Sequence, residues 1–231
     1  MTTQEAPRDD SWRTLTPEIV LRAYAAGIFP MADGRNATEL YWVDPEVRGI
    51  LPLDKFHVPR RLKRTLRANP FEVRTDTAFE DVIRSCAETR TDDGETWIND
   101  EIIRLFVELH RMGFAHSVES WRDGKLVGGL YGVALGAAFF GESMFARETD
   151  ASKVALVHLV ARLRYGDFVL LDTQFVTDHL KTFGAIGIRR TDYRRRLAKA
   201  IDRRAHFYLD LSPEDSDELV EGFLQSTTQT S

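Results

Sequence analysis

The sequence has very little cysteine: Cys86 is the only one in 231 residues, so a disulfide framework is excluded. This usage is typical of proteins from reducing compartments, and the N-terminal MTTQEAPRDD lacks the apolar stretch of a signal peptide. We therefore expect a cytoplasmic location. Cys86 falls in a predicted helix, DVIRSCAETR, where packing is a more natural role than nucleophilic chemistry.

Common cofactor and nucleophile motifs are also missing. The six histidines are scattered, and no set of His, Cys and Asp has the spacing of a zinc site. No Gly-Lys-Ser/Thr phosphate loop is present, and Gly128, Gly129 and Gly132 do not form a dinucleotide fingerprint. Ser143 lies in Gly-Glu-Ser-Met-Phe, which is not a nucleophile elbow. We expect no metal and no cofactor.

No stretch has the length and apolarity of a transmembrane helix. In the most apolar one, residues 126–145, the uncharged run ends before Glu142 and is shorter than the ~20 apolar residues that a span needs, and glycines interrupt it. A buried helix would tolerate these glycines poorly, so two buried strands with a turn near Leu135–Gly136 fit better. Asp123-Gly124 just before them predicts a hairpin. The expected antiparallel strands are 116–122, 126–134 and 137–145.

A predicted helix at 150–163 and a strand at 168–175 follow this meander. A strand–helix–strand crossover places its two strands parallel, so we expect a mixed sheet. Asp172 and Gln174 are two residues apart and would share one face of the strand. Because a carboxylate is costly to bury without a partner, Asp172 and Glu142 are candidate functional residues.

Basic residues are scarce at one end of the chain and clustered elsewhere. The net charge is −5, but residues 205–231 hold six acidic residues and no lysine or arginine, so subtracting −6 leaves +1 for residues 1–204. Two predicted helices, near 59–67 and 192–204, are strongly basic. Either one alone could be a solvated face, whereas together they favour a polyanionic partner. The basic residues concerned are Lys63, Arg64, Arg67, Arg194, Arg195 and Arg196.

Seven short motifs occur in a fixed order along the chain. They are Arg22-Ala-Tyr24 with Gly27-Ile-Phe29-Pro30, Thr96-Trp97-Ile98, His116-Ser117-Val118-Glu119, Leu126-Val-Gly-Gly129 with Tyr131-Gly132-Val133, Gly141-Glu142-Ser143-Met144-Phe145, Ala151-Ser152-Lys153, and Leu171-Asp172-x-Gln174 with Asp178-His179 and Phe183-Gly184-Ala185. In this order they resemble the leucyl/phenylalanyl-tRNA–protein transferase family. The resemblance runs from about Leu15 to Leu197 and does not include the acidic segment from Phe207 onward.

The resemblance implies an α+β fold, with a small N-terminal domain followed by a GNAT-like (Fem-type) acyltransferase domain built on a mixed sheet. We expect these domains at 1–46 and 47–206, and an acidic C-terminal tail with a short helix at 207–231. The implied partners are Leu-tRNA and Phe-tRNA as donors and proteins with N-terminal Arg or Lys as acceptors, without a membrane. The acceptor would be marked for N-terminal-rule (N-degron) degradation.

The implied chemistry is aminolysis of an activated ester, for which the enzyme mainly aligns two substrates. Asp172 would polarise the Gln174 amide, and Gln174 Oε1 would accept a hydrogen bond from the attacking amine. A carboxamide is a poor base, so Gln174 is better regarded as a positioning acceptor. Glu142 would serve as a counter-charge for a cationic acceptor or accept hydrogen bonds from ribose hydroxyls.

The remaining implied residues bind substrate. Met144 would form an adaptable wall of the amino-acid pocket, beside Ser143. Aromatic residues at the positions of Tyr24, Trp97 and Phe139 would hold the terminal adenosine of the tRNA. Two substitutions depart from the family pattern: Met31 stands where tryptophan is frequent, and Phe106 stands where tyrosine is common, so Phe106 contributes no hydroxyl.

Strand alternation raises a question about two of these residues. Strict alternation places Phe139 and Glu142 on opposite faces of their strand. A bulge near Gly141 would bring them together, and without it one of the two lies outside the site.

Two other functions remain open at this point. A GNAT-like N-acyltransferase with a small thioester donor would not need Lys63, Arg64 and the Arg194–Arg196 cluster. A non-catalytic RNA-binding module would have no reason to bury Glu142 and Asp172.

Overall fold

The computed structural model describes residues 15–37, 39–89, 96–207 and 211–226. The beginning of the expected N-terminal domain and parts of the expected tail lie outside these ranges. The helices within them are α1 (Pro17–Ala26), α2 (Arg60–Ala68), α3 (Phe79–Thr89), α4 (Asp100–Arg111), α5 (Ala151–Tyr165), α6 (Asp178–Lys181), α7 (Arg190–Ile201), α8 (Pro213–Ser226) and a 3-10 turn, η2 (Leu53–Lys55). The strands are β1 (Phe29–Ala32), β2 (Leu40–Val43), β3 (Val47–Ile50), β4 (Glu72–Thr75), β5 (Ala115–Arg122), β6 (Lys125–Leu135), β7 (Ala138–Ala146), β8 (Leu170–Gln174) and β9 (Ile186–Arg189).

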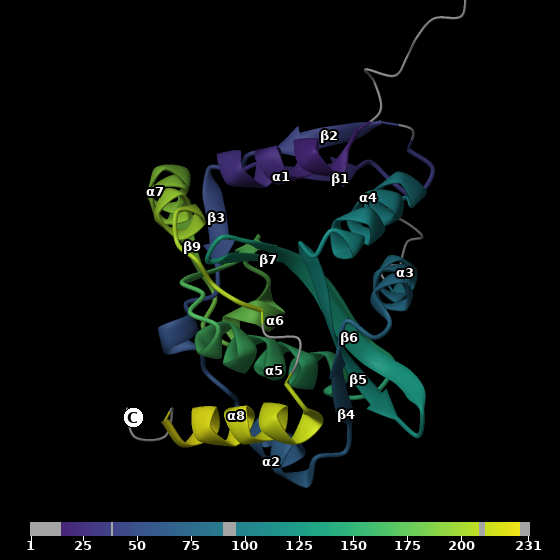
Figure 1. The fold of residues 1–231 in the computed structure, drawn as a ribbon, viewed down its shortest axis with the longest axis vertical. Coiled ribbons are helices and arrows are strands. Elements are labelled where there is room, and N and C mark those ends of the chain that lie inside the picture. The colour runs from purple at the N-terminus through teal and green to yellow at the C-terminus, as the bar shows by residue number, and fades with distance from the viewer. Residues whose placement is uncertain (1–14, 38, 90–95, 208–210, 227–231) are drawn as a thin grey trace, which may run out of the picture.

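A mixed sheet forms the centre of the molecule, with the strand order β4-β5-β6-β7-β8-β3-β9 (Figure 1). β7 and β8 are parallel and are connected by α5, whereas the other neighbouring pairs in this order are antiparallel. The expected α+β class and the parallel crossover are therefore confirmed. The Asp123-Gly124 hairpin is also confirmed, and both residues have the positive φ, 51° and 72°, of a tight hairpin turn.

The N-terminal part contributes a small unit of one helix and two strands. Pro17 opens α1, and Gly27 ends it in the left-handed conformation with φ 86°, which are the common roles of proline and glycine at helix ends. β1 and β2 then pair as a separate antiparallel sheet. The chain next enters the large sheet as β3, which lies between β8 and β9 although it precedes both in sequence. β3 therefore links the small unit directly to β8 and β9 of the large sheet.

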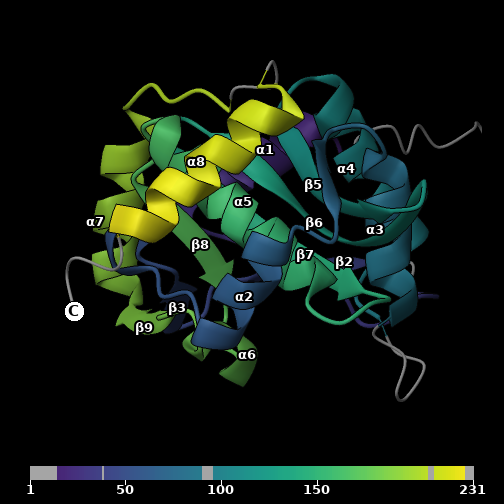
Figure 2. The ribbon, with the colours of Figure 1, turned by 90° about the horizontal axis from the view of Figure 1, so that it is seen from below.

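Two hydrophobic clusters cover the two faces of the large sheet. One is built around α5 and includes residues of α2 and α8, and the other includes residues of α1, α3, α4 and α7. Figure 2 shows α8 crossing over α5 on the outer side of the first face. Val220, Phe223 and Leu224 of α8 are buried in that cluster, so this part of the acidic tail is an element of the core. No helix of the described part of the chain is both long and apolar enough to cross a membrane.

Candidate active site

A cavity opens where β7 and β8 separate. The two strands pair only as far as Phe140 and Asp172, after which β7 continues beside β6 and β8 runs beside β3. The cavity has a volume of about 390 Å³, in the range of small-molecule sites. Residues just beyond the last paired positions line it from both strands: Glu142, Ser143 and Met144 from β7, and Thr173, Gln174 and Phe175 at the end of β8.

A β-bulge directs Glu142 at this site. Tyr131 of β6 is opposite Ser143, and the next residue of β6, Gly132, is opposite Gly141, so Glu142 is the extra residue on β7. Bulges bend a strand locally and re-aim a side chain. The bulge that the sequence analysis considered near Gly141 is thus present, one residue later.

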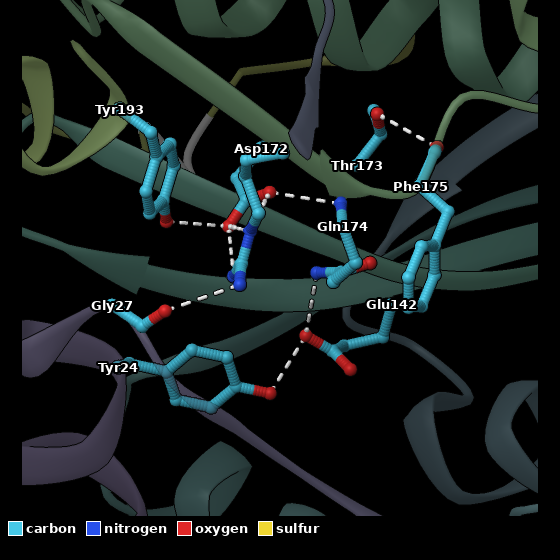
Figure 3. Close-up of polar contacts among 9 residues, drawn as sticks. Tyr24, Gly27, Glu142, Asp172, Thr173, Gln174, Phe175 and Tyr193 are labelled. Carbon is cyan, nitrogen blue, oxygen red and sulfur yellow. Dashed lines mark hydrogen bonds and ion pairs between the residues drawn. The ribbon is translucent and has the colours of Figure 1, made fainter. Parts of the chain in front are cut away.

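The buried Glu142 carboxylate joins the N-terminal part to the end of β8 (Figure 3). Its Oε1 accepts hydrogen bonds from the Tyr24 hydroxyl at 2.7 Å and from Gln174 Nε2 at 3.3 Å. A carboxylate only accepts hydrogen bonds, so the amide group of Gln174 must turn its Nε2 toward Glu142. The other end of the amide, Gln174 Oε1, is then the acceptor. Burial and the nearby Glu142 charge raise the pKa of Tyr24 well above its ordinary value, so Tyr24 remains a neutral donor.

Asp172 lies beside this pair but has a different set of partners. It accepts hydrogen bonds from Arg48, from the Tyr193 hydroxyl at 2.7 Å, and from the backbone N–H of Gln174 at 2.8 Å. The expectation that Asp172 polarises the Gln174 carboxamide is not met, because its contact with Gln174 is through the backbone. The shared-face argument fails at Gln174, whose φ of 54° takes it out of strand conformation.

Arg48 is the residue of this region that the sequence analysis missed. It is 1% exposed, forms an ion pair of 2.6 Å with Asp172, and donates from Nη1 to the Gly27 carbonyl at 3.1 Å. Burial disfavours its charge, but the hydrogen bonds and charge of Asp172 outweigh this effect and raise the pKa of Arg48. The sequence does contain an indication of this role: Arg48 lies in an otherwise apolar strand, and a buried carboxylate needs such a cationic partner.

The cavity walls are mostly apolar. Leucines from β6, α5, β8 and α6 line it, together with Met144, Phe29, Met31 and Trp97. The leucines are Leu130, Leu156, Leu159, Leu171 and Leu180. Ser143 Oγ and His179 Nε2 are buried in this lining and have no hydrogen-bond partner among the described residues. Burial and the charge of Lys153 lower the pKa of His179, so its imidazole is held neutral. Both atoms are available to a ligand.

Three aromatic residues predicted for the site, Phe139, Phe106 and Tyr24, are not among the residues that line the cavity. Phe139 is fully buried in the α5-side hydrophobic cluster, where its ring stacks on that of Phe207 with the ring centres 5.6 Å apart. The bulge follows Phe139 in the chain, so it does not change the side of β7 on which the Phe139 side chain lies. Phe106 is fully buried on α4, with its ring edge-on to Tyr131 at 5.6 Å. Tyr24 is fully buried too, and it reaches the site through its hydroxyl.

The predicted basic residues fall on two separate helices. Lys63, Arg64 and Arg67 lie on α2, and the Arg194–Arg196 cluster lies on α7 near the opposite end of the molecule (Figure 1). Arg194 forms an ion pair of 2.7 Å with Asp44, so part of the α7 charge binds the N-terminal part of the same chain. Among the described residues, no group of three or more His, Cys, Asp and Glu is arranged to hold a metal ion.

Comparisons with known proteins give a consistent family. The family model described as leucyl/phenylalanyl-tRNA protein transferase matches residues 50–198, and the model of its N-terminal domain matches residues 13–46. Proteins named leucyl/phenylalanyl-tRNA–protein transferase are similar to this chain. One from Paramagnetospirillum magneticum is 67% identical over 84% of this chain and 93% of its own length. One from Phenylobacterium zucineum is 55% identical over 92% of this chain and 96% of its own length. A weak structural similarity, with a TM-score of 0.39 and 12% identity, covers 85% of this chain and 80% of L-PGS from Bacillus licheniformis. On the family models and the close relatives, this chain belongs to the leucyl/phenylalanyl-tRNA–protein transferase family.

Proposed function

We propose that this protein transfers Leu or Phe from aminoacyl-tRNA to the α-amine of proteins that begin with Arg or Lys, in the bacterial cytoplasm, and so marks them for degradation. Family membership supports an aminoacyl-tRNA donor and a protein acceptor. The observation that carries the proposal is the Gln174 amide, held by Glu142 at 3.3 Å in the wall of an apolar cavity. It combines a fixed acceptor for an amine with space for an apolar side chain.

The reaction forms one amide bond and breaks one ester bond. The neutral α-amine of the acceptor attacks the ester carbonyl carbon, the bond to the ribose oxygen breaks, and the amine proton passes to that oxygen. Gln174 Oε1 accepts a hydrogen bond from the amine. This contact orients the amine so that the lone pair of its nitrogen points at the ester carbonyl carbon. Because an amide is a poor base, Gln174 aligns the amine without taking its proton.

The apolar part of the cavity suits the side chain of the transferred amino acid. Met144 and the leucine side chains supply contact area without charge, and methionine adapts readily to different shapes. Such a pocket discriminates by only about 1–3 kcal/mol per methylene. Met-tRNA should therefore be a slower donor than Leu-tRNA, and Asp-tRNA should be excluded.

Two further assignments belong to the proposal. The α2 residues Lys63, Arg64 and Arg67 contact the phosphate backbone of the tRNA. Residues 1–46, 47–206 and 207–231 correspond to the N-terminal domain, the aminoacyltransferase domain and the acidic C-terminal tail.

The direct test is transfer of labelled Leu from Leu-tRNA to a synthetic peptide that begins with Arg. A peptide that begins with Glu is the acceptor control, and a leucyl thioester of coenzyme A is the donor control for the alternative acyltransferase. Transfer from tRNA to the Arg peptide supports the proposal. Transfer from the thioester in place of tRNA, or equal labelling of the two peptides, contradicts it.

A further inference from the structure

We propose that Arg48 is a positioning residue for the transfer reaction: together with Tyr193 it saturates Asp172, which in turn holds the backbone of Gln174. This inference rests on the proposed function, because it concerns how the Gln174 amide is kept in place. We call Arg48, Asp172 and Tyr193 the Asp172 cluster.

The protein itself fills the acceptor sites of the Asp172 carboxylate. A carboxylate offers about four lone-pair sites. Oδ1 accepts from Arg48 Nε at 2.9 Å and from the Gln174 N–H at 2.8 Å. Oδ2 accepts from Arg48 Nη2 at 2.6 Å and from the Tyr193 hydroxyl at 2.7 Å. Because all three members of the cluster are at most 1% exposed and the four sites are filled, Asp172 has no site left for a substrate amine.

The backbone of Gln174 has an unfavourable conformation that its contacts must hold in place. Its φ of 54° lies in the left-handed region, which residues with a side chain other than Asn and Asp rarely adopt. The next peptide closes a tight turn, with the Phe175 N–H donating to the Thr173 carbonyl at 2.6 Å. Left-handed backbone persists only where its surroundings determine it. The bond from the Gln174 N–H to the buried Asp172 is one of the contacts that do so.

The contacts of residue 48 require an arginine side chain. Two nitrogens of the Arg48 fork bind Asp172, while Nη1 binds the carbonyl of Gly27 at the end of α1. The guanidinium also lies 4.4 Å from the Phe29 ring centre and 4.6 Å from that of Tyr193. Lysine keeps the charge but cannot reproduce this planar set of donors.

Arg48 thereby aligns both donors to Glu142. Gln174 is held through Asp172, and Tyr24 lies in the last turn of α1, whose C-terminal Gly27 is bound by Arg48. No member of the Asp172 cluster is among the residues that line the cavity. A change in the cluster should therefore alter turnover and leave substrate binding almost unchanged.

The first experiment compares Arg48→Lys with Arg162→Lys. Arg162 is a matched control, because it is a buried arginine, 4% exposed, on α5 with its guanidinium 5.6 Å from the Phe207 ring and away from the cavity. We expect Arg48→Lys to lower kcat by about 10- to 100-fold, the scale of a small misplacement of reacting groups, with KM for Leu-tRNA within twofold of the unmodified protein. Arg162→Lys should keep kcat within twofold. An unchanged kcat in Arg48→Lys, or an equal loss in both variants, overturns the proposal.

A milder variant covers the case in which Arg48→Lys does not fold. Tyr193→Phe removes one hydrogen bond to Asp172 and keeps the ring beside Arg48, so it should fold and lower kcat by a smaller factor at constant KM. Full activity of a folded Tyr193→Phe protein, together with an unfolded Arg48→Lys protein, would leave the cluster with a purely structural role and overturn the proposal.

Amide hydrogen exchange provides a readout that does not require activity. The Gln174 N–H should lose protection in Arg48→Lys or Tyr193→Phe, while it stays protected in Arg162→Lys. Unchanged protection of Gln174 in both cluster variants counts against the proposal. If the unmodified protein transfers no Leu, the proposed function fails by itself, and the exchange measurement still tests whether the cluster holds Gln174.

Discussion

Glu142 and Asp172 are both buried carboxylates near the end of a strand, yet their surroundings give them different roles. Asp172 is neutralised by Arg48 and has its acceptor sites filled by the protein. Glu142 lines the cavity and accepts from the neutral donors Tyr24 and Gln174. We therefore propose that Glu142 is the carboxylate that meets a cationic or hydroxyl-bearing substrate, whereas Asp172 holds the backbone N–H of Gln174.

Replacing Tyr24 by Phe tests the Glu142 arrangement. The change removes one hydrogen bond to a charged group, which contributes about 1.5–3 kcal/mol, and it should lower kcat/KM by roughly tenfold or more. Because the pKa of Tyr24 is raised, its stabilising contribution is complete below the ordinary tyrosine value and is lost only in strong alkali. The difference in urea midpoint between the two proteins should thus be constant from about pH 6 to 9. A difference that shrinks within this range would show that Tyr24 ionises there.

At the scale of elements, the close approach of β3 to β8 shapes the site. Gly49 of β3 has no room for a side chain, because an added Cβ would lie 2.6 Å from the backbone carbon of Phe175. Gly187 of β9 is directly opposite Gly49 in the sheet, and an added Cβ there would lie 2.7 Å from the Val47 side chain and in ordinary contact, at 3.9 Å, with that of Val176. Val47 is 58% exposed and can rotate away.

These two glycines form a matched pair for mutation. Gly49→Ala should push the end of β8 outward, lower stability by about 1–3 kcal/mol and reduce kcat by up to about 100-fold. Gly187→Ala should have little effect on either quantity. Thermal melts and single-turnover rates of the two variants provide the measurement, and equal effects of the two changes would contradict the assigned role of the β3–β8 contact.

The packing of α8 on α5 should make stability depend on pH. His158 of α5 is 4% exposed, with Nδ1 3.1 Å from Ser216 Oγ and Nε2 3.9 Å from Asp217 of α8. Burial, with the charge of Arg162, lowers the pKa of His158 to about 3. The neutral form is thus favoured by folding, so its contribution is complete above pH 6.5 and is lost as the pH falls from 6.5 toward 3.

Unfolding in urea can detect this contribution. The unmodified protein should lose about 2 kcal/mol between pH 6.5 and pH 5 from His158, and His158→Gln should lose correspondingly less. Asp217→Asn is the control: burial raises the pKa of Asp217, so its titration stabilises the fold as the pH falls, which is opposite in sign to the effect of His158. A loss of stability that persists undiminished in His158→Gln would show that His158 is not its source.

At the scale of the whole molecule, charge is separated along the chain and across the surface. The basic helix α2 and the acidic helix α8 both flank α5, and Asn69 at the end of α2 donates to Asp217 of α8 at 2.9 Å. The net charge of −5 therefore conceals a basic surface on α2. The basic residues of α7 lie elsewhere, and some of them form ion pairs within the chain.

Charge reversal on α2 should weaken the binding of tRNA. The double change Lys63→Glu and Arg64→Glu should raise KM for Leu-tRNA and reduce the slope of log KM against log salt by about 1.8, or about 0.9 for each phosphate that the protein no longer neutralises. Arg84→Glu with Arg104→Glu, on α3 and α4, changes the net charge equally and is the control. A salt slope that is the same in both double variants would remove α2 from the tRNA interface.

Much of the fold could be predicted from local patterns. The apolarity and glycine content of 126–145 predicted two strands, and Asp123-Gly124 predicted the hairpin that joins the first of them to the preceding strand. These features depend on neighbours in sequence, which is why the sequence suffices. The same reasoning predicted that the strands carrying Glu142 and Gln174 are parallel, since a crossover helix connects them, and the structure confirms this.

The sequence by itself thus determined the elements, the mixed sheet and the family motifs, whereas the tertiary structure decided how the site is connected. Arg48 is 124 residues from its partner Asp172, and only the insertion of β3 beside β8 brings them together. Likewise, the bulge at Glu142 breaks the alternation of β7, and the left-handed Gln174 breaks the alternation of β8 that placed Asp172 and Gln174 on one face. Buried polar groups choose their partners by three-dimensional proximity and unfilled hydrogen-bonding sites, and neither quantity is local in the sequence.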